Sequence, residues 1–212
     1  RKETIIRTDK KTNLPPIAKD VKANGERPDE ITLTWDGSIS STAQIKDYKI
    51  YRRAQGEKDF TAIIEIPAVT STEGGYIHVD KGVKPETEYA YYFTALSDEP
   101  NVIKPESDRS GELKATTPKD YKVEFMSVVE EKNRVYIRIG KYLNEKWEKK
   151  EVFIVKGEKI DKDKFITGWT LVDFQKDVFE RKMDDGRIIK KPTFRIIYLD
   201  KGREFSFLIE PK

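Results

Sequence analysis

Apolar and polar residues alternate along the first 118 residues, and this alternation predicts β-strands. In "ITLTW", Ile31, Leu33 and Trp35 point to one side and two threonines to the other, which is the period-two pattern of a half-buried strand. The stretch "DYKIYRR" from Asp47 alternates in the same way. No apolar stripe in this half recurs at helical spacing. Further strands are predicted at residues 17–23, 60–66, 76–79, 88–96 and 112–116, which makes seven in all.

The sequence from residue 119 onward predicts a second set of strands. "YKVEFMSVVEEKNRVYIRIGKYL" predicts two strands joined by a turn at "EEKN", and "KEVFIVKGEKI" predicts a third that ends at Gly157. "GWTLVDFQKDVFERKM" predicts a long strand that breaks near Gln175, with Leu171 on one face and Phe174 on the other. "DDG" is a hairpin signal, and "TFRIIYL" and "REFSFLI" predict a final hairpin. We therefore expect an all-β domain of six or seven strands.

A turn precedes the most aromatic strand, in "GVKPETEYAYYFTAL" from Gly82 to Leu96. In a two-sheet sandwich the chain crosses between the sheets before a central strand, and the crossing loop exposes backbone groups that need partners. A tyrosine just inside the new strand can bond its hydroxyl back to that loop, an arrangement called a tyrosine corner. Tyr89 is placed for this role, and Val83, Pro85 and Thr87 form the approach.

This segment resembles the L-x-P-x-T-x-Y signature of fibronectin type III domains, with Val83 where that family usually has leucine. The resemblance covers residues 14–118 and implies a non-catalytic β-sandwich in which the large aromatic residues form the core. Other features agree with it in order and spacing, namely Pro16, Trp35, Tyr48, Ile50, Ala95 and the closing "SGELKATTP" from Ser110.

Length also favours two domains, because 212 residues suit two cores of about 100 residues each. We expect a leader or linker at residues 1–13, the fibronectin-like domain at 14–118 and the second all-β domain at 119–212. The second domain has no tyrosine corner. It resembles small β domains of bacterial pilus-assembly lipoproteins and type II secretion proteins through "G-x-x-I" at Gly157 and Ile160, a resemblance that carries over no functional residue.

Composition narrows the possible partners and the possible chemistry. The 41 basic and 38 acidic residues are interspersed, so no long field of one sign favours nucleic acid. The absence of cysteine rules out disulfides and thiolate zinc sites. No apolar run reaches the roughly 20 residues of a membrane span. The chain begins with Arg1, so we expect a processed chain or a fragment of a longer one.

The sequence gives little support for catalysis. The single histidine, His78, lies in a predicted strand on the face of Tyr76 and Asp80, where a packing or surface role is expected. No metal-ligand spacing, calcium loop, nucleophile motif or phosphate-binding glycine loop is present. We expect no enzyme activity, no metal and no cofactor.

Two groups of residues are candidates for partner contact. Residues 119–212 hold 23 basic and 18 acidic residues, and the positive excess gathers beside the predicted hairpin. These cations either keep the hairpin soluble and its edge unpaired or contact an acidic partner. Tyr142 and Trp147 lie among lysines, where they either cap the core or contact a protein or glycan. The basic candidates are Arg181, Lys182, Arg187, Lys190 and Lys191.

Two functional hypotheses follow from these features. The first is a non-catalytic interaction or spacer module of a bacterial cell-envelope or secreted protein, which binds a protein of unknown identity. The alternative is an accessory carbohydrate-binding segment of a carbohydrate-active enzyme. A planar row of exposed Trp and Tyr would favour the glycan, whereas an apolar or unpaired edge strand would favour a protein partner.

Overall fold

Strands make up nearly all of the regular structure in the computed structural model, which describes residues 15–36, 45–68, 75–100 and 102–211. The all-β fold class is therefore confirmed. The chain divides into two compact units, Arg1–Pro118 and Lys119–Lys212, here called the first unit and the second unit. The expected leader, residues 1–13, lies outside the described residues.

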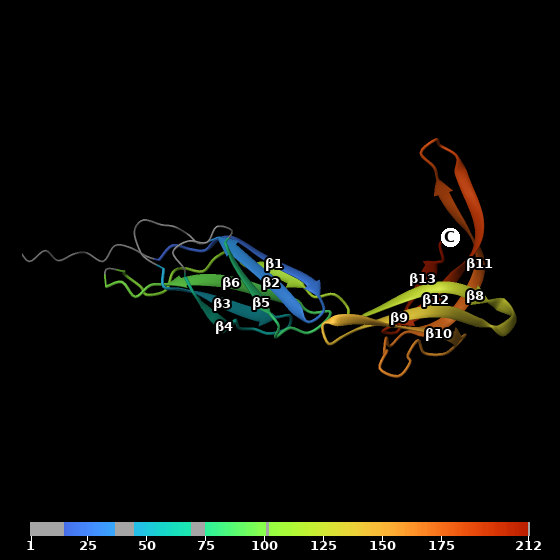
Figure 1. The fold of residues 1–212 in the computed structure, drawn as a ribbon, viewed down its shortest axis with the longest axis horizontal. Coiled ribbons are helices and arrows are strands. Elements are labelled where there is room, and N and C mark those ends of the chain that lie inside the picture. The colour runs from blue at the N-terminus through green and yellow to red at the C-terminus, as the bar shows by residue number, and fades with distance from the viewer. Residues whose placement is uncertain (1–14, 37–44, 69–74, 101, 212) are drawn as a thin grey trace, which may run out of the picture. The chain divides into compact units, whose positions relative to one another are not determined.

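The first unit is a sandwich of two antiparallel sheets (Figure 1). One sheet has the order β1–β2–β5 and the other β4–β3–β6–β7. Each of the seven predicted strands is present, although β1 starts later than predicted and continues to Arg27 through two register irregularities. The strands are β1 (Lys19–Arg27), β2 (Glu30–Asp36), β3 (Asp47–Ala54), β4 (Thr61–Pro67), β5 (Tyr76–Asp80), β6 (Glu88–Leu96) and β7 (Leu113–Thr116).

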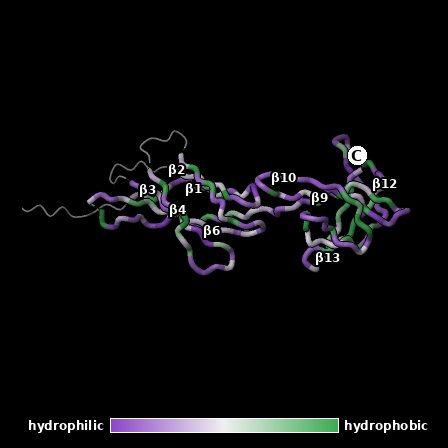
Figure 2. Tube along the Cα trace, turned by 60° about the horizontal axis from the view of Figure 1, so that its bottom comes forward, coloured by the Kyte–Doolittle hydropathy of each residue, from purple (hydrophilic) through white to green (hydrophobic). Residues whose placement is uncertain are grey.

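Aromatic rings fill the space between these two sheets. Trp35 is fully buried, and its ring centroid lies 5.2 Å from that of Tyr76, 5.1 Å from Phe93 and 5.7 Å from Tyr48. Each such ring removes a large apolar area from water, which compensates for the low apolar content of the chain. The alternation of buried apolar and exposed polar residues can be followed as changes of colour along the strands in Figure 2.

The tyrosine corner is confirmed. The Tyr89 ring is buried, and its hydroxyl oxygen accepts a hydrogen bond of 2.8 Å from the backbone N–H of Lys84. Thr117, just after β7, holds the same loop from the other side. Its hydroxyl donates to the Lys84 carbonyl at 2.6 Å and accepts from the Thr87 N–H at 3.1 Å. The crossing loop therefore has partners for its backbone groups.

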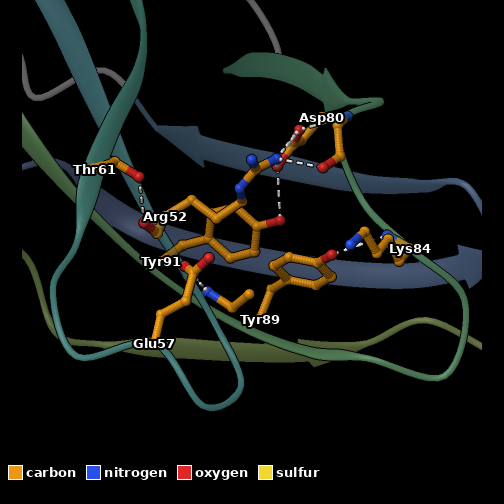
Figure 3. A network of polar contacts seen from close by, with 9 residues as sticks. Arg52, Glu57, Thr61, Asp80, Lys84, Tyr89 and Tyr91 are labelled. Atoms are coloured by element: carbon orange, nitrogen blue, oxygen red, sulfur yellow. Dashed lines mark hydrogen bonds and ion pairs between the residues drawn. The ribbon is translucent and has the colours of Figure 1, made fainter.

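A buried carboxylate joins the two sheets beside this corner (Figure 3). The two carboxylate oxygens of Asp80 on β5 accept from Arg52 Nη1 on β3, at 2.8 and 2.9 Å, and one of them also accepts from the Tyr91 hydroxyl on β6 at 2.9 Å. Gly82 N–H donates to the same carboxylate at 3.0 Å. Burial and the neighbouring Asp80 raise the pKa of Tyr91, so its hydroxyl remains a donor across the ordinary pH range.

The second unit also consists of two antiparallel sheets, with the orders β10–β9–β8 and β11–β12–β13. Its fully buried side chains include Ile137, Ile139, Ile160, Leu171 and Ile196. A short 3-10 helix, η1 (Glu130–Lys132), forms the turn predicted at "EEKN". The six strands are β8 (Tyr121–Val129), β9 (Arg134–Leu143), β10 (Lys146–Val155), β11 (Thr170–Lys182), β12 (Ile188–Asp200) and β13 (Arg203–Leu208).

Two details of the predicted strands in this unit are wrong. The third strand, β10, ends at Val155 and not at Gly157, because Gly157 adopts a left-handed φ of 89° in a turn. The long strand, β11, does not break near Gln175. Its irregularity is a shift of register between Leu171 and Asp173, and the extra residue changes the phase of alternation. Phe174 consequently packs on the same core as Leu171, not on the opposite face.

The tyrosine corner predicts a measurable contribution to stability. Tyr89→Phe should lower the free energy of unfolding of the first unit by about 1 kcal/mol, because the Lys84 N–H loses its acceptor. Denaturant unfolding followed by circular dichroism measures the change. Tyr92→Phe is the control, because the Tyr92 hydroxyl makes no hydrogen bond with the described residues. Equal effects of the two substitutions would contradict the assignment.

The Asp80 network predicts a larger loss. Asp80→Ala should destabilise the first unit by about 3 kcal/mol, because it leaves the partly buried Arg52 guanidinium without a counter-charge. Glu112→Ala is the matched control. It breaks the exposed Arg53–Glu112 pair and should change stability by no more than about 0.5 kcal/mol. Chemical denaturation of the two variants in parallel checks this, and a small effect at Asp80 would show that the sheets do not depend on it.

Candidate protein-interaction site

The paired ends of β11 and β12 form a two-stranded arm in the second unit. β13 pairs with β12 only from Arg195 to Asp200. Ile209 extends this cover, because its N–H donates to the Phe194 carbonyl at 3.0 Å and its carbonyl accepts a hydrogen bond from the Thr193 hydroxyl. From Thr193 back toward the turn between the two strands, β11 and β12 pair only with each other among the described residues. We call residues 178–192 the arm, and Figure 1 shows it extending past the other strands of its unit.

The tip of the arm is a closed turn. Met183 N–H donates to the Arg187 carbonyl at 2.8 Å, and Gly186 N–H donates to the Met183 carbonyl at 2.9 Å. Gly186 has a φ of 85°, a conformation that favours glycine, so the "DDG" signal is confirmed as a hairpin turn. Asp185 caps the turn, because its carboxylate accepts from the backbone N–H of Arg187 at 3.1 Å and from its side chain at 2.7 Å.

Both faces of the arm combine apolar and basic side chains. On the face that continues the core, Val178 and Ile188 are 47% and 59% exposed and share the face with Lys182. The opposite face carries Phe179 and the 39% exposed Ile189. The cations of this opposite face stand directly across the strands from these residues, since Lys191 pairs with Phe179 and Arg181 with Ile189. A two-stranded ribbon has no second layer in which to bury such residues.

Ion pairs neutralise only part of the charge on the arm. Lys190 pairs with Glu180, and Arg187 pairs with Asp185. Arg181, Lys182 and Lys191 have no ion pair among the described residues. At the base of the arm, Asp177 binds Arg195 at 2.6 Å, and the backbone N–H of Val178 together with Arg195 lowers the pKa of Asp177. The carboxylate of Asp177 is thus already occupied within the hairpin.

The structure brings together five of the predicted contact residues and separates two. All five basic candidates lie on the arm or its turn and are exposed. Tyr142 and Trp147 face each other across β9 and β10, in the other sheet. Prediction from charge missed the apolar members of the arm. Their signal in the sequence is two adjacent apolar pairs, "VF" at 178–179 and "II" at 188–189, which place an apolar residue on each face of a strand.

The half-buried rings of Tyr142, Trp147, Tyr51 and Tyr92 do not form a flat platform. Tyr142 contacts Trp147 edge to face at 5.4 Å, and the Lys122 ammonium group lies 4.2 Å from the Trp147 ring centroid. On the outer face of the first unit, the rings of Tyr51 and Tyr92 stack on each other at 4.4 Å, with Phe60 tilted against Tyr92 at 4.8 Å. These ring faces are therefore used on one another or on a cation.

The single histidine of the chain has a shifted pKa. His78 is half-buried on β5, and burial lowers its pKa while the nearby Asp80 carboxylate opposes this change. Within residues 15–36, 45–68, 75–100 and 102–211, no cluster of three or more His, Cys, Asp or Glu could hold a metal ion. The same residues contain no helix that is long and apolar enough to cross a membrane.

Comparisons with known proteins identify structural neighbours only. No family model and no curated protein matches the sequence. A solved structure titled "Myokine structure" is 16% identical and covers 50% of this chain and 100% of its own, with a TM-score of 0.39. A Fn3-like protein from Clostridium thermocellum is 24% identical, and the match covers 50% of this chain and 97% of that protein, with a TM-score of 0.37. The FN1–FN3 domains of chicken CNTN1 are 13% identical, and the match covers 92% of this chain and 68% of that one, with a TM-score of 0.35.

The first unit has the fibronectin type III fold. Its two sheets and the bond from Lys84 to the Tyr89 hydroxyl carry this assignment. The resemblance of residues 119–212 to envelope-assembly domains is not tested by these comparisons and stays a prediction.

The arm should open more readily than the rest of its hairpin. Backbone amides of residues 178–182 and 188–191 lack a third strand, so their hydrogen bonds are exposed and supported by few buried side chains. Hydrogen exchange followed by mass spectrometry should show at least about tenfold faster exchange there than at residues 195–199 of the same strand β12. Equal protection along β12 would show that another part of the chain covers the arm.

Proposed function

We propose that this chain is a non-catalytic protein-interaction module of a larger secreted or cell-envelope protein, and that the arm binds an acidic protein partner. The first unit serves as a rigid spacer, and the second unit presents the contact surface. The localisation rests on the resemblances described above, and the contact rests on the arm.

One observation supports the proposal most directly. The arm exposes Val178, Ile188 and Ile189 to water beside the cations Arg181, Lys182 and Lys191, none of which is paired within the described residues. Exposed apolar side chains are unfavourable in water, and a partner that covers them stabilises the complex. Adjacent unpaired cations favour a partner whose surface combines carboxylates with apolar groups.

The tip of the arm disfavours a polyanion as the partner. Asp184 and Asp185 lie at the turn, so a phosphate backbone running along the arm would meet carboxylates at its end. Interspersed charges elsewhere give no continuous basic track. The engaged ring faces of Trp147, Tyr51 and Tyr92 also favour a protein over a glycan, because sugar stacking needs a free ring face.

Charge reversal on the arm tests the proposal. The full chain and its Arg181→Glu/Lys191→Glu variant are used to capture proteins from an envelope extract of the source organism, and binding of the captured protein is then measured with purified components. The variant should bind at least about tenfold more weakly, and binding of the wild type should weaken as salt rises.

Lys132→Glu/Lys146→Glu is the matched control. It changes the net charge by the same amount at two exposed cations of the second unit that have no ion pair among the described residues. It should leave binding within about twofold of wild type. Equal losses in both variants would indicate a non-specific charge effect, and retention only on a glycan column would support the carbohydrate alternative.

A further inference from the structure

β13 has an open edge with a defined set of outward-facing backbone groups. Lys201 and Gly202, with φ of 49° and 77°, form the two-residue turn between β12 and β13. In such a hairpin the residues flanking the turn form a hydrogen-bonded pair, and every second pair follows the same pattern. Arg203, Phe205 and Phe207 therefore bond to β12. The N–H and C=O groups of Glu204, Ser206 and Leu208 face outward, and β13 pairs with no other described strand.

Unlike other outer strands of the chain, β13 has no device that prevents pairing along most of its length. β4 ends in Pro67, β10 carries consecutive charges from Glu148 to Glu151, and β5 points the charged Asp80 inward. Prolines, charges and inward-pointing ionic groups are the usual means of protecting a sheet edge. The stretch "FSFL", residues 205–208, has neither charge nor proline, and its pairing with β12 shows no bulge.

The same edge leaves part of the core open. Phe205 and Phe207 lie on the face of β13 that continues the core, yet each is 44% exposed. Phe207 contacts the ring of Phe125 at 5.5 Å, and Phe205 contacts Tyr198 at 5.7 Å. Two rings are thus half-covered on one side, at the position where an added strand would lie.

We propose that this edge pairs with β13 of a second copy of the chain, antiparallel and about a two-fold axis at Ser206. In this register Ser206 lies opposite Ser206 of the partner subunit, and Glu204 lies opposite Leu208 of the partner subunit. Outward-facing groups then meet outward-facing groups, so each pair exchanges both of its backbone hydrogen bonds. This contact is on β13 and does not rest on the proposed role of the arm.

The side chains select this register over its neighbours. Phe205 comes opposite Phe207 of the partner subunit on the core face, in the non-hydrogen-bonded position where cross-strand rings are closest. A shift of two residues in one direction places Glu204 opposite Glu210 of the partner subunit, two like charges. A shift in the other direction places Phe207 opposite Arg203 of the partner subunit. A shift of one residue puts the rings on the wrong face.

Cysteine cross-linking tests this register, because the natural sequence contains no cysteine. In the proposed dimer the two Ser206 Cα atoms lie about 5.5 Å apart, within the range a disulfide can bridge. The two Glu204 Cα atoms lie four residues out of register, at about 14 Å, beyond that range. Ser206→Cys and Glu204→Cys are a matched pair, since both residues are exposed on the outer face of β13.

Under mild oxidation the Ser206→Cys chain should form a disulfide-linked dimer at least about tenfold faster than the Glu204→Cys chain, on non-reducing gels. Circular dichroism verifies that both variants fold. Equal rates in two folded variants would overturn the proposal.

Sedimentation of the cysteine-free chain at rising concentration provides the second readout. Its dimer should be lost in Ser206→Lys, which places two ammonium groups together at the axis, and a dimer that survives this change would also overturn the proposal.

Discussion

The Asp80 carboxylate is the contact on which the architecture of the first unit depends. It lies on one sheet and binds Arg52 and Tyr91 on the other, so a single buried charge fixes how the two layers face each other. Burying a carboxylate is costly unless donors surround it, and here a guanidinium, a phenol and the Gly82 N–H do so. The loop that follows is then held at two points, by Gly82 at this network and by Lys84 at the Tyr89 hydroxyl. The aromatic core fills a space whose width these polar contacts set.

The sequence predicted this first unit well because its signals are local. Tyr89 stands at a fixed distance from Pro85 and Thr87, and the inward series Ile31, Leu33 and Trp35 follows the pleat of one strand. The role of Asp80 was not predicted. Its partners come from β3 and β6, and nothing in the residues around Asp80 shows that an arginine 28 positions earlier will face it. Tertiary pairing of this kind has no periodicity to detect.

In the second unit, prediction failed where the backbone departs from regular pleating. A single extra residue between Leu171 and Asp173 moved Phe174 into the core, and the alternation of the letters gives no sign of it. Only the charged residues of the candidate contact surface were predicted, because the exposure of its apolar residues also depends on how the strands pair. Excess charge in a turn is visible in the sequence, but the exposure of Val178 and Ile189 depends on where β13 stops covering β12. That limit is set by the short turn at Lys201 and Gly202 and the position of Ile209.

The closed turn at Met183–Arg187 leaves the reach of the arm adjustable. No third strand lies beside residues 178–192 in the described part of the chain, so two residues added to each strand near the tip would lengthen the ribbon by about 6.8 Å, keep every side chain on its face and leave the buried layer undisturbed. A residue added to one strand only would reverse which side chains face which way beyond it. Natural variation in this hairpin should therefore occur in matched steps, and related chains could differ in how far they extend toward a target while keeping the same supporting body.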